Sequence, residues 1–99
     1  MNLDEDEAKK IAHAIAFGHA YWKHATVVSE SGELISESSF ESLILETILH
    51  PTKSRGLERS RMAFWNAREG LLVLHDPGDT DLGTAYWPKG GVNEYKNLR

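Results

Sequence analysis

Residues 59–88 read RSRMAFWNAREGLLVLHDPGDTDLGTAYWP, and their pattern predicts three β-strands in succession. In residues 61–65 (RMAFW) the side chains alternate between two faces, with the methionine and the phenylalanine together on one of them. Residues 71–74 (LLVL) form a continuous apolar run, which is typical of a strand covered on both faces. A third strand is predicted over residues 83–87 (GTAYW).

The connections between these strands are short. Residues 66–70 end in glycine, and residues 76–79 (DPGD) have the composition of a turn. Short connections favour an antiparallel meander, because a parallel crossover needs a dozen or more residues. Residues 52–57 are expected to be a basic linker into the sheet, and residues 92–98 a last strand or turn. With helices over one face of the sheet, the other face would be available for a ligand.

Two helices are predicted before the sheet. Residues 4–24 have apolar residues at three- and four-residue spacing and acidic residues in the first turn. A capping box of Ser38 and Glu41 is expected to begin the second helix, and Pro51 to stop it after His50. The fold class expected is therefore α+β, with N-terminal helices packed on one face of a C-terminal antiparallel sheet of about three to five strands.

Length and composition are those of one globular domain over residues 1–99. The chain has 40% hydrophobic and 26% charged residues, which argues against a disordered or membrane protein. No apolar run approaches the length of a membrane span, and residues 1–7 are acidic, unlike a signal peptide. We therefore expect no membrane association, and export only on a carrier. The absence of cysteine excludes disulfides, thiol nucleophiles and cysteine-ligated zinc.

The charge is distributed unevenly along the chain. Residues 1–50 hold three Lys against nine Asp or Glu, a net charge of −6, whereas residues 51–99 hold eight Lys or Arg against six acids, a net charge of +2. The overall charge of −4 argues against indiscriminate nucleic-acid binding. The half of the chain that forms the sheet is nevertheless the electropositive half.

Two histidines near the end of the first predicted helix are candidates for acid–base chemistry. His19 and His24 are five residues apart, about 140° around a helix. They therefore lack the four-residue spacing by which two histidines on one helix face bind a metal. His19 shares a face with Lys23, and a neighbouring ammonium disfavours the protonated imidazole, which suits a general base. The alternative is that both are partly buried residues bonded to backbone. Helix-surface or capping roles are expected for His13, His50 and His75.

Hydrogen-bond donors suited to a phosphodiester are predicted on one face of the sheet. Arg59 and Arg61 lead into the first strand, Thr84 lies in the third, and Lys89 follows it. Guanidinium, ammonium and hydroxyl groups together can bind a phosphate and stabilise charge on its oxygens. The alternative is an ordinary solvated sheet face.

The aromatic residues and the aspartates of the sheet have simpler expected roles. Trp65, Tyr86 and Trp87 are mostly core candidates, although one that faced outward could stack on a base. Asp76, Asp79 and Asp81 with Gly83 faintly resemble a calcium loop, but the glutamate that such a loop needs is absent. A turn is the better interpretation.

Three segments together carry a resemblance to a known group of proteins. They are GHAYWKH at 18–24, SRMAFW at 60–65 and DLGTAYWP at 81–88. Their order and spacing are similar to C-terminal toxin domains of bacterial polymorphic toxins, including contact-dependent growth inhibition proteins, over about residues 17–98. This sequence departs from the pattern where Ser60 replaces a Gly and where Tyr86-Trp87 replace Phe-Arg. The missing Arg removes one phosphate contact, which Lys89 would replace.

The resemblance implies the barnase, EndoU, colicin and RelE-like fold and a metal-independent endoribonuclease without a cofactor. Colicin D, a transfer-RNA nuclease, carries a Lys-His-Ala that is similar to residues 23–25, so tRNA is the expected substrate. By position, His19 or His24 would be acid or base, Arg61 a phosphate contact and Thr84 a transition-state donor. The substrate-binding residues would be Lys23, Arg59, Lys89 and Tyr86.

The expected reaction is a transesterification that leaves a 2′,3′-cyclic phosphate and a 5′-hydroxyl. The resemblance further implies a cognate immunity protein, acidic where it covers the basic face, as the partner. It also implies delivery as part of a larger secreted or cell-surface toxin, with action in the cytoplasm of the target cell.

Two other functions fit the same residues. One is a non-catalytic protein-interaction module, in which Trp22, Trp65 and Trp87 form the binding patch and the histidines are structural. The other is a ribosome-dependent nuclease of the RelE kind, which would cut only translated messenger RNA.

Overall fold

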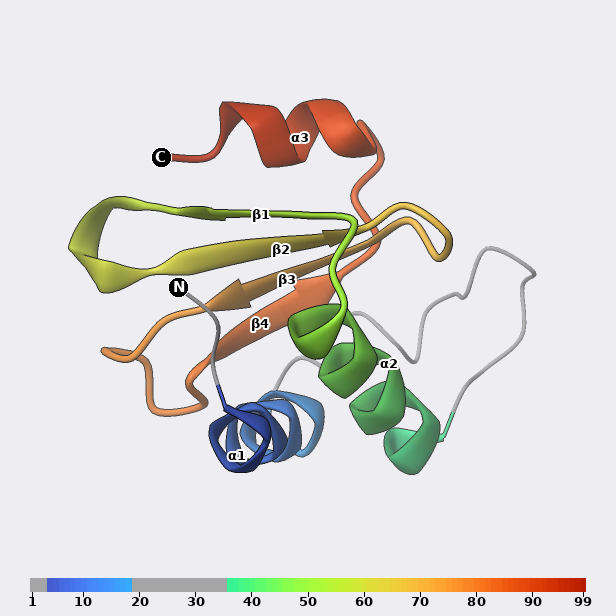
Figure 1. Ribbon diagram of the computed structural model, residues 1–99, viewed down its shortest axis with the longest axis vertical. Coiled ribbons are helices and arrows are strands. Elements are labelled where there is room, and N and C mark those ends of the chain that lie inside the picture. The colour runs from blue at the N-terminus through green and yellow to red at the C-terminus, as the bar shows by residue number, and fades with distance from the viewer. Residues whose placement is uncertain (1–3, 19–35) are drawn as a thin grey trace.

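The computed structural model describes residues 4–18 and 36–99. Two helices precede a four-stranded antiparallel sheet in the order β1-β2-β3-β4, and a short helix follows it (Figure 1). The predicted α+β fold, with N-terminal helices and a C-terminal antiparallel sheet, is confirmed. The elements are α1 (Glu5–Ala16), α2 (Glu37–Leu49), β1 (Lys53–Gly56), the 3₁₀ turn η2 (Glu58–Ser60), β2 (Met62–Asn66), β3 (Leu71–His75), β4 (Gly83–Tyr86) and α3 (Val92–Asn97). None of the helices in these two ranges is long and apolar enough to cross a membrane.

Helix α1 begins at a side-chain cap and ends earlier than the sequence pattern indicates. The Asp4 carboxylate accepts a hydrogen bond from the Glu7 backbone N–H at 2.7 Å, which satisfies one of the free donors of the first turn. The helix ends at Ala16, so the predicted helix over residues 4–24 is too long at Phe17 and Gly18, and its remainder lies outside the described residues. The predicted apolar stripe is buried, as Ala8, Ile11, Ala12, Ile15 and Ala16.

Helix α2 begins two residues before the predicted capping box. Ser36, with an extended backbone, accepts a hydrogen bond from the Ser39 backbone N–H at 3.1 Å, so Ser36 and not Ser38 is the N-cap. Ser36 already provides the oxygen that the first turn needs. The predicted end is confirmed, because the last helical residue is Leu49 and the C-cap is His50, immediately before Pro51. Its buried residues are Phe40, Ile44, Thr47 and Ile48.

The face of the sheet toward α1 and α2 carries the larger core. Phe64 pairs with Val73, which pairs in turn with Ala85, so three strands present apolar side chains in one row. Leu71 and the apolar residues of both helices complete this cluster. The alternation predicted for the first strand is therefore confirmed, with Phe64 on the helix side and Ala63 on the opposite side.

Two predictions at the borders of the sheet are wrong. Residues 53–56, expected in a linker, form strand β1, which pairs with β2 from Lys53 opposite Trp65 to Gly56 opposite Met62. Residues 92–97, expected in a strand or turn, form helix α3. Strand β1 is polar and largely exposed at the edge of the sheet, so it lacks the apolar alternation that reveals a strand.

Helix α3 covers part of the sheet face that was expected to be open. Figure 1 shows α3 on the opposite side of the sheet from α1 and α2. Tyr95 of α3 packs with Ala63, Trp65 and Leu72 in a second buried cluster. The expectation of a wholly free face is therefore wrong.

The start of β4 needs glycine at one position. Gly83 has φ of 137°, and a Cβ there would lie 1.9 Å from the backbone oxygen of Leu74 in β3. Any side chain at this residue would collide with the neighbouring strand. The preceding loop is the predicted turn, since the Asp76 carboxylate accepts from the Gly78 N–H at 2.9 Å and the Asp79 carboxylate from the Asp81 N–H at 3.1 Å.

Candidate nucleic-acid interface

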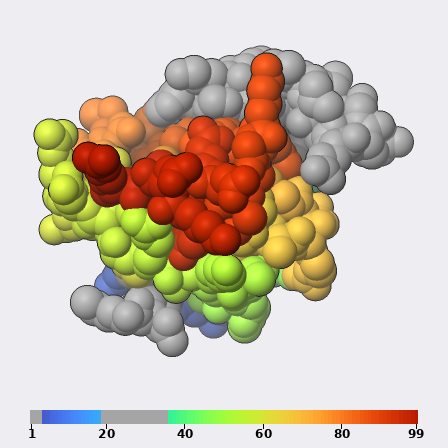
Figure 2. Space-filling view, turned by 90° about the horizontal axis from the view of Figure 1, so that it is seen from above, coloured from blue at the N-terminus to red at the C-terminus, as the bar shows by residue number. Residues whose placement is uncertain are grey.

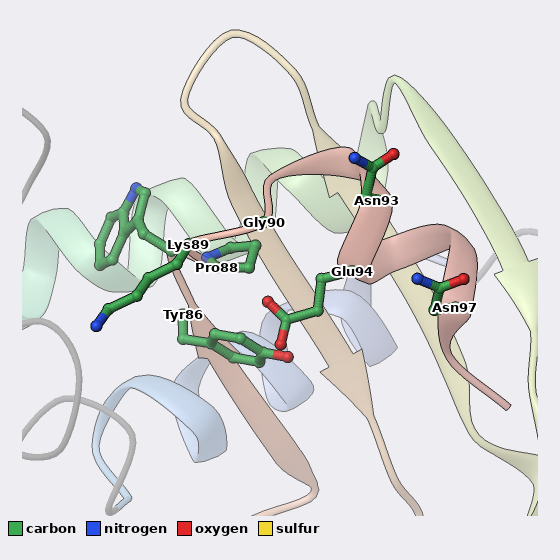
Figure 3. Close-up of a pocket in the computed structure, with 8 residues that line it drawn as sticks. Tyr86, Pro88, Lys89, Gly90, Asn93, Glu94 and Asn97 are labelled. Carbon is green, nitrogen blue, oxygen red and sulfur yellow. The ribbon is translucent and has the colours of Figure 1, made fainter.

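An open pocket of about 540 Å³ lies between the end of β4 and helix α3 (Figure 3). Its size is in the usual range for sites that bind small molecules. The wall from the strand side is aromatic and apolar, whereas the helix side contributes a carboxylate and two amides. The lining residues are Tyr86, Trp87, Pro88, Lys89, Gly90, Asn93, Glu94 and Asn97.

Tyr86 and Glu94 form the polar centre of this pocket. Their side chains point toward one another in Figure 3, while Lys89 extends away from the pair. Burial, and then the charge of Glu94 and a hydrogen bond to it, raise the pKa of Tyr86 above its ordinary value of 10.0. The phenol is therefore protonated at neutral pH and donates to the Glu94 carboxylate.

Thr84 lies on the same strand and the same face as Tyr86, about 7 Å away along the strand. Its hydroxyl oxygen is buried and has no hydrogen-bond partner in the part of the chain that the structure describes. Buried polar atoms are nearly always paired, so this unpaired hydroxyl is exceptional. The donor is unused, but neighbouring atoms cover it, so a ligand oxygen reaches it only after a local rearrangement.

Arg55 holds the end of α3 against the sheet, and Arg61 binds the residue that follows its C-cap. Arg55 of β1 donates through Nη1 to the backbone oxygens of Tyr95 at 3.0 Å and Lys96 at 2.8 Å, and through Nη2 to that of Leu98. Arg61 donates through Nε to the Glu58 oxygen at 3.0 Å and through Nη2 to the Arg99 oxygen. A helix end leaves such carbonyl groups without partners, and cationic side chains satisfy them.

Cationic residues on α3, on strand β1 and in the turn before β2 form what we call the basic surface, made of Lys53, Arg55, Arg59, Arg61, Lys96 and Arg99. Lys53, Arg59, Lys96 and Arg99 are exposed, and no carboxylate in residues 4–18 and 36–99 pairs with them within 4.0 Å. Figure 2 shows this side, with α3 (red) across the middle and β1 and η2 (green to yellow-green) beside it. The acidic first turn of α1 belongs to the opposite layer of the molecule.

The structure brings together some of the predicted site residues and separates others. Tyr86 and Lys89 line one pocket, and Thr84 is their neighbour on β4. Arg59 and Arg61 lie near the other edge, at the beginning of β2, with β3 between β2 and β4. Two strand spacings, about 10 Å, therefore separate the strands that carry the arginines from the strand that carries Thr84.

The predicted residues His19, Lys23 and His24 lie outside the described residues. The chain reaches that segment from Gly18, whose backbone lies against Asp81: a Cβ on Gly18 would be 2.6 Å from Asp81 Cγ. Asp81 stands two residues before the start of β4. The described chain that precedes His19 therefore ends beside the entry to the strand that carries Thr84.

The other histidines have the structural roles expected of them. His13 is exposed, and its Nδ1 lies 3.0 Å from a carboxylate oxygen of Glu41. His75 Nδ1 donates to the Leu82 backbone oxygen at 3.0 Å and so ties β3 to the loop before β4. His50 caps α2 through its backbone.

The tryptophan patch proposed for an interaction module is not formed by Trp65. That side chain is only 6% exposed and lies in the cluster under α3. Trp87 is half-buried and stacks on Phe40 of α2, with ring centroids 5.7 Å apart. Trp22 lies outside the described residues.

Sequence reasoning missed the helix side of the pocket. Asn93, Glu94 and Asn97 were assigned no role, because residues 92–98 were expected to form a strand or turn. The available signal was the spacing of Val92, Tyr95 and Leu98, which all pack toward the sheet at intervals of three residues.

Comparison of the chain with protein-family models, with curated proteins and with solved structures found no match.

Proposed function

We propose that this chain is a metal-independent endoribonuclease domain of the toxin kind that binds RNA across the basic surface and the β4–α3 pocket. One observation carries the proposal: Lys53, Arg59, Lys96 and Arg99 are exposed on one side of the molecule without carboxylate partners in the described residues. Unpaired cations of this kind bind nucleic-acid phosphates and release counterions from them.

Because the charges are segregated, the basic surface attracts a polyanion more strongly than the net charge of the chain suggests. The acidic side chains of residues 4–18 and 36–50 belong to the helical layer, where α1 begins with Glu5, Asp6 and Glu7. The basic surface faces away from that layer, so an approaching polyanion is attracted to one side and repelled from the other. Transfer RNA, a compact polyanion, is the substrate that we favour.

The proposed reaction transfers protons through imidazole groups. One neutral imidazole, of His19 or His24, takes the proton of a ribose 2′-hydroxyl, and the 2′-oxygen forms a bond to the adjacent phosphorus. The bond from phosphorus to the 5′-oxygen breaks, and a second proton donor protonates that oxygen. The two histidines enter the mechanism from the sequence alone.

Residues of β4 and its end would stabilise the charge that develops on the phosphoryl oxygens. The Thr84 hydroxyl has no hydrogen-bond partner among residues 4–18 and 36–99 and would donate once the atoms that cover it move aside, and the Lys89 ammonium is exposed beside the pocket. Donors fixed in place before the reaction are the most effective at this step. Thr84 is accordingly the transition-state donor in our proposal.

Arg61 keeps donors for a phosphate although it holds the end of the chain. A guanidinium has five N–H donors, and the described bonds of Arg61 use Nε and one N–H of Nη2. Nη1 makes no described bond. Arg61 would therefore contact a phosphate at the border of the basic surface, and Arg59 would contact the next one.

The biological setting that we propose follows the predicted resemblance. The domain would be delivered by a larger secreted or cell-surface toxin and act in the cytoplasm of the target cell. An acidic immunity protein covering the basic surface would protect the producing cell.

The experiment is an incubation of the purified chain with labelled tRNA and with DNA of the same sequence, each with and without EDTA. We expect loss of RNA only, no effect of EDTA, and products that end in a 2′,3′-cyclic phosphate. Equal cutting of DNA, or inhibition by EDTA, would refute this chemistry. Cutting of messenger RNA only when ribosomes translate it would instead favour the RelE-like alternative.

A further inference from the structure

The pocket between β4 and α3 has the two kinds of wall that bind a nucleobase. The strand side of the pocket offers the Tyr86 ring and the Pro88 ring, with Trp87, whose own ring stacks on Phe40, at its border, and one side is open to solvent. Bases stack on aromatic side chains with gains of about 1–3 kcal/mol each. The opposite wall, on α3, is polar and could contact the edge of a stacked base.

The polar wall is dominated by an acceptor. Glu94, when ionised, can only accept hydrogen bonds, and its two oxygens offer about four positions for donors. The Tyr86 hydroxyl occupies one of these positions. Asn93 and Asn97, one helical turn apart, add amide groups that can donate or accept.

The four RNA bases differ in how they match such a carboxylate. Adenine and cytosine each place a ring acceptor beside their amino group, and uracil places a carbonyl on either side of its single N–H. Guanine alone presents two adjacent N–H donors, from the ring and from the amino group, on one edge. A carboxylate accepts both of them at once and would be repelled by the acceptors of the other bases.

We propose that the β4–α3 pocket binds a guanine base, with the Glu94 carboxylate accepting hydrogen bonds from its two adjacent N–H groups and the apolar wall stacking on its ring. The domain would therefore cut RNA next to guanosine. This inference rests on the proposed function for the identity of the polymer, although the binding of guanine itself is independent of cleavage.

The position of the pocket suits this role. Thr84 lies about 7 Å from Tyr86 on the same strand face, and Lys89 stands at the rim. A guanosine held against Tyr86 would direct one of its phosphates along β4 toward the unpaired Thr84 hydroxyl. Base recognition and transition-state stabilisation would then belong to neighbouring residues of one strand.

The test is an NMR titration of the purified chain with the four nucleoside 3′-monophosphates. We expect guanosine 3′-monophosphate to bind at least tenfold more tightly than the others and to shift the backbone signals of residues 86–97 and the indole N–H of Trp87. Glu94→Gln replaces one acceptor by a donor, so it should weaken guanosine binding about tenfold or more. Glu58→Gln removes an exposed carboxylate outside the pocket and should leave binding unchanged.

Equal affinity for the four nucleotides, no binding of any, or full guanosine selectivity in Glu94→Gln would overturn the inference. Mapping of cleaved RNA ends separates it from the proposed function. Selective guanosine binding without RNA cleavage would contradict only the nuclease, whereas cleavage without preference for guanosine would contradict only the base assignment. Thermal unfolding of Glu94→Gln, an exposed position on α3, verifies that the variant is folded.

Discussion

Arg55 donates a hydrogen bond from Nη1 to the backbone oxygen of Tyr95 at 3.0 Å, which joins edge strand β1 to helix α3. The guanidinium carbon also lies 5.8 Å from the centre of the Tyr95 ring. Since α3 is only six residues long, it depends on such contacts for its position. That position creates both the pocket and the basic surface.

Replacement of Arg55 by Ala should release α3. The variant loses charge-assisted hydrogen bonds to three backbone oxygens, so the free energy of unfolding should fall by about 1.5–3 kcal/mol. Arg55→Lys keeps the charge without the planar fork and should recover only part of the loss. Denaturant unfolding measures both, and a stability equal to wild type in Arg55→Ala would show that α3 is held in another way.

Replacement of Gly83 by Ala should be severely destabilising. Its Cβ would overlap the Leu74 backbone oxygen, and the backbone conformation is one that only glycine adopts easily. We expect a loss of about 3 kcal/mol or more, or failure to fold. Gly56→Ala is the matched control, since a Cβ there meets nothing within 4 Å, and its effect should be within about 1 kcal/mol.

Replacement of Thr84 by Val should separate stability from activity. The hydroxyl is buried without a partner among the described residues, so its removal should leave the free energy of unfolding unchanged or raise it by about 1 kcal/mol. The rate of RNA cleavage should fall about a hundredfold, as for other donors to a transition state. Full activity in Thr84→Val would remove Thr84 from the mechanism.

Thr47→Val is the control for that experiment. The Thr47 hydroxyl donates to the Leu43 oxygen at 2.7 Å and accepts from Asn66 Nδ2 at 3.0 Å. Its loss should destabilise the fold by about 1–3 kcal/mol, because the Asn66 amide is left buried and unpaired. Cleavage by the folded fraction should be unchanged.

The ionisation of Tyr86 gives a pH signature of the pocket. Its pKa in the folded protein is raised above 10.0, so folding favours the protonated phenol, and the associated stability is present below pH 10 and lost as the pH rises through the folded pKa. Absorbance of the phenolate, compared between wild type and Tyr86→Phe, measures that pKa. Glu94→Gln should lower it only in part, because burial is the largest cause. No change in Glu94→Gln would contradict the contact between the two side chains.

Periodicity was sufficient for most of the fold. The apolar spacing of α1 and the alternation in β2 both predict which side chains are buried, since burial on one face is what creates these patterns. Strand β1 was not predicted, because an exposed edge strand needs no apolar side chains and so shows no alternation. Helix α3 was missed because the three-residue spacing of Val92, Tyr95 and Leu98 extends over only seven residues, too few to distinguish a helix from a turn.

The candidate site was predictable only on the strand side. Tyr86 and Lys89 follow from their place at the end of a strand, and both line the pocket. Glu94 faces Tyr86 only because α3 folds back over the sheet and is held there by Arg55 from the far edge. The contact between Tyr86 and Glu94 depends on tertiary packing, which a local sequence pattern does not predict.

The cleavage rate of labelled tRNA in the presence of EDTA tests the role of the basic surface most directly. It should be measured for wild type, for Lys53→Glu with Arg59→Glu, and for Lys10→Glu as a control on an exposed residue of α1. We expect cleavage by wild type and by Lys10→Glu, and at least a tenfold loss in the double variant, with the loss growing smaller as salt is added. Absence of cleavage by the folded wild-type chain, or equal rates in all three proteins, would contradict an RNA-cutting function on this side of the molecule.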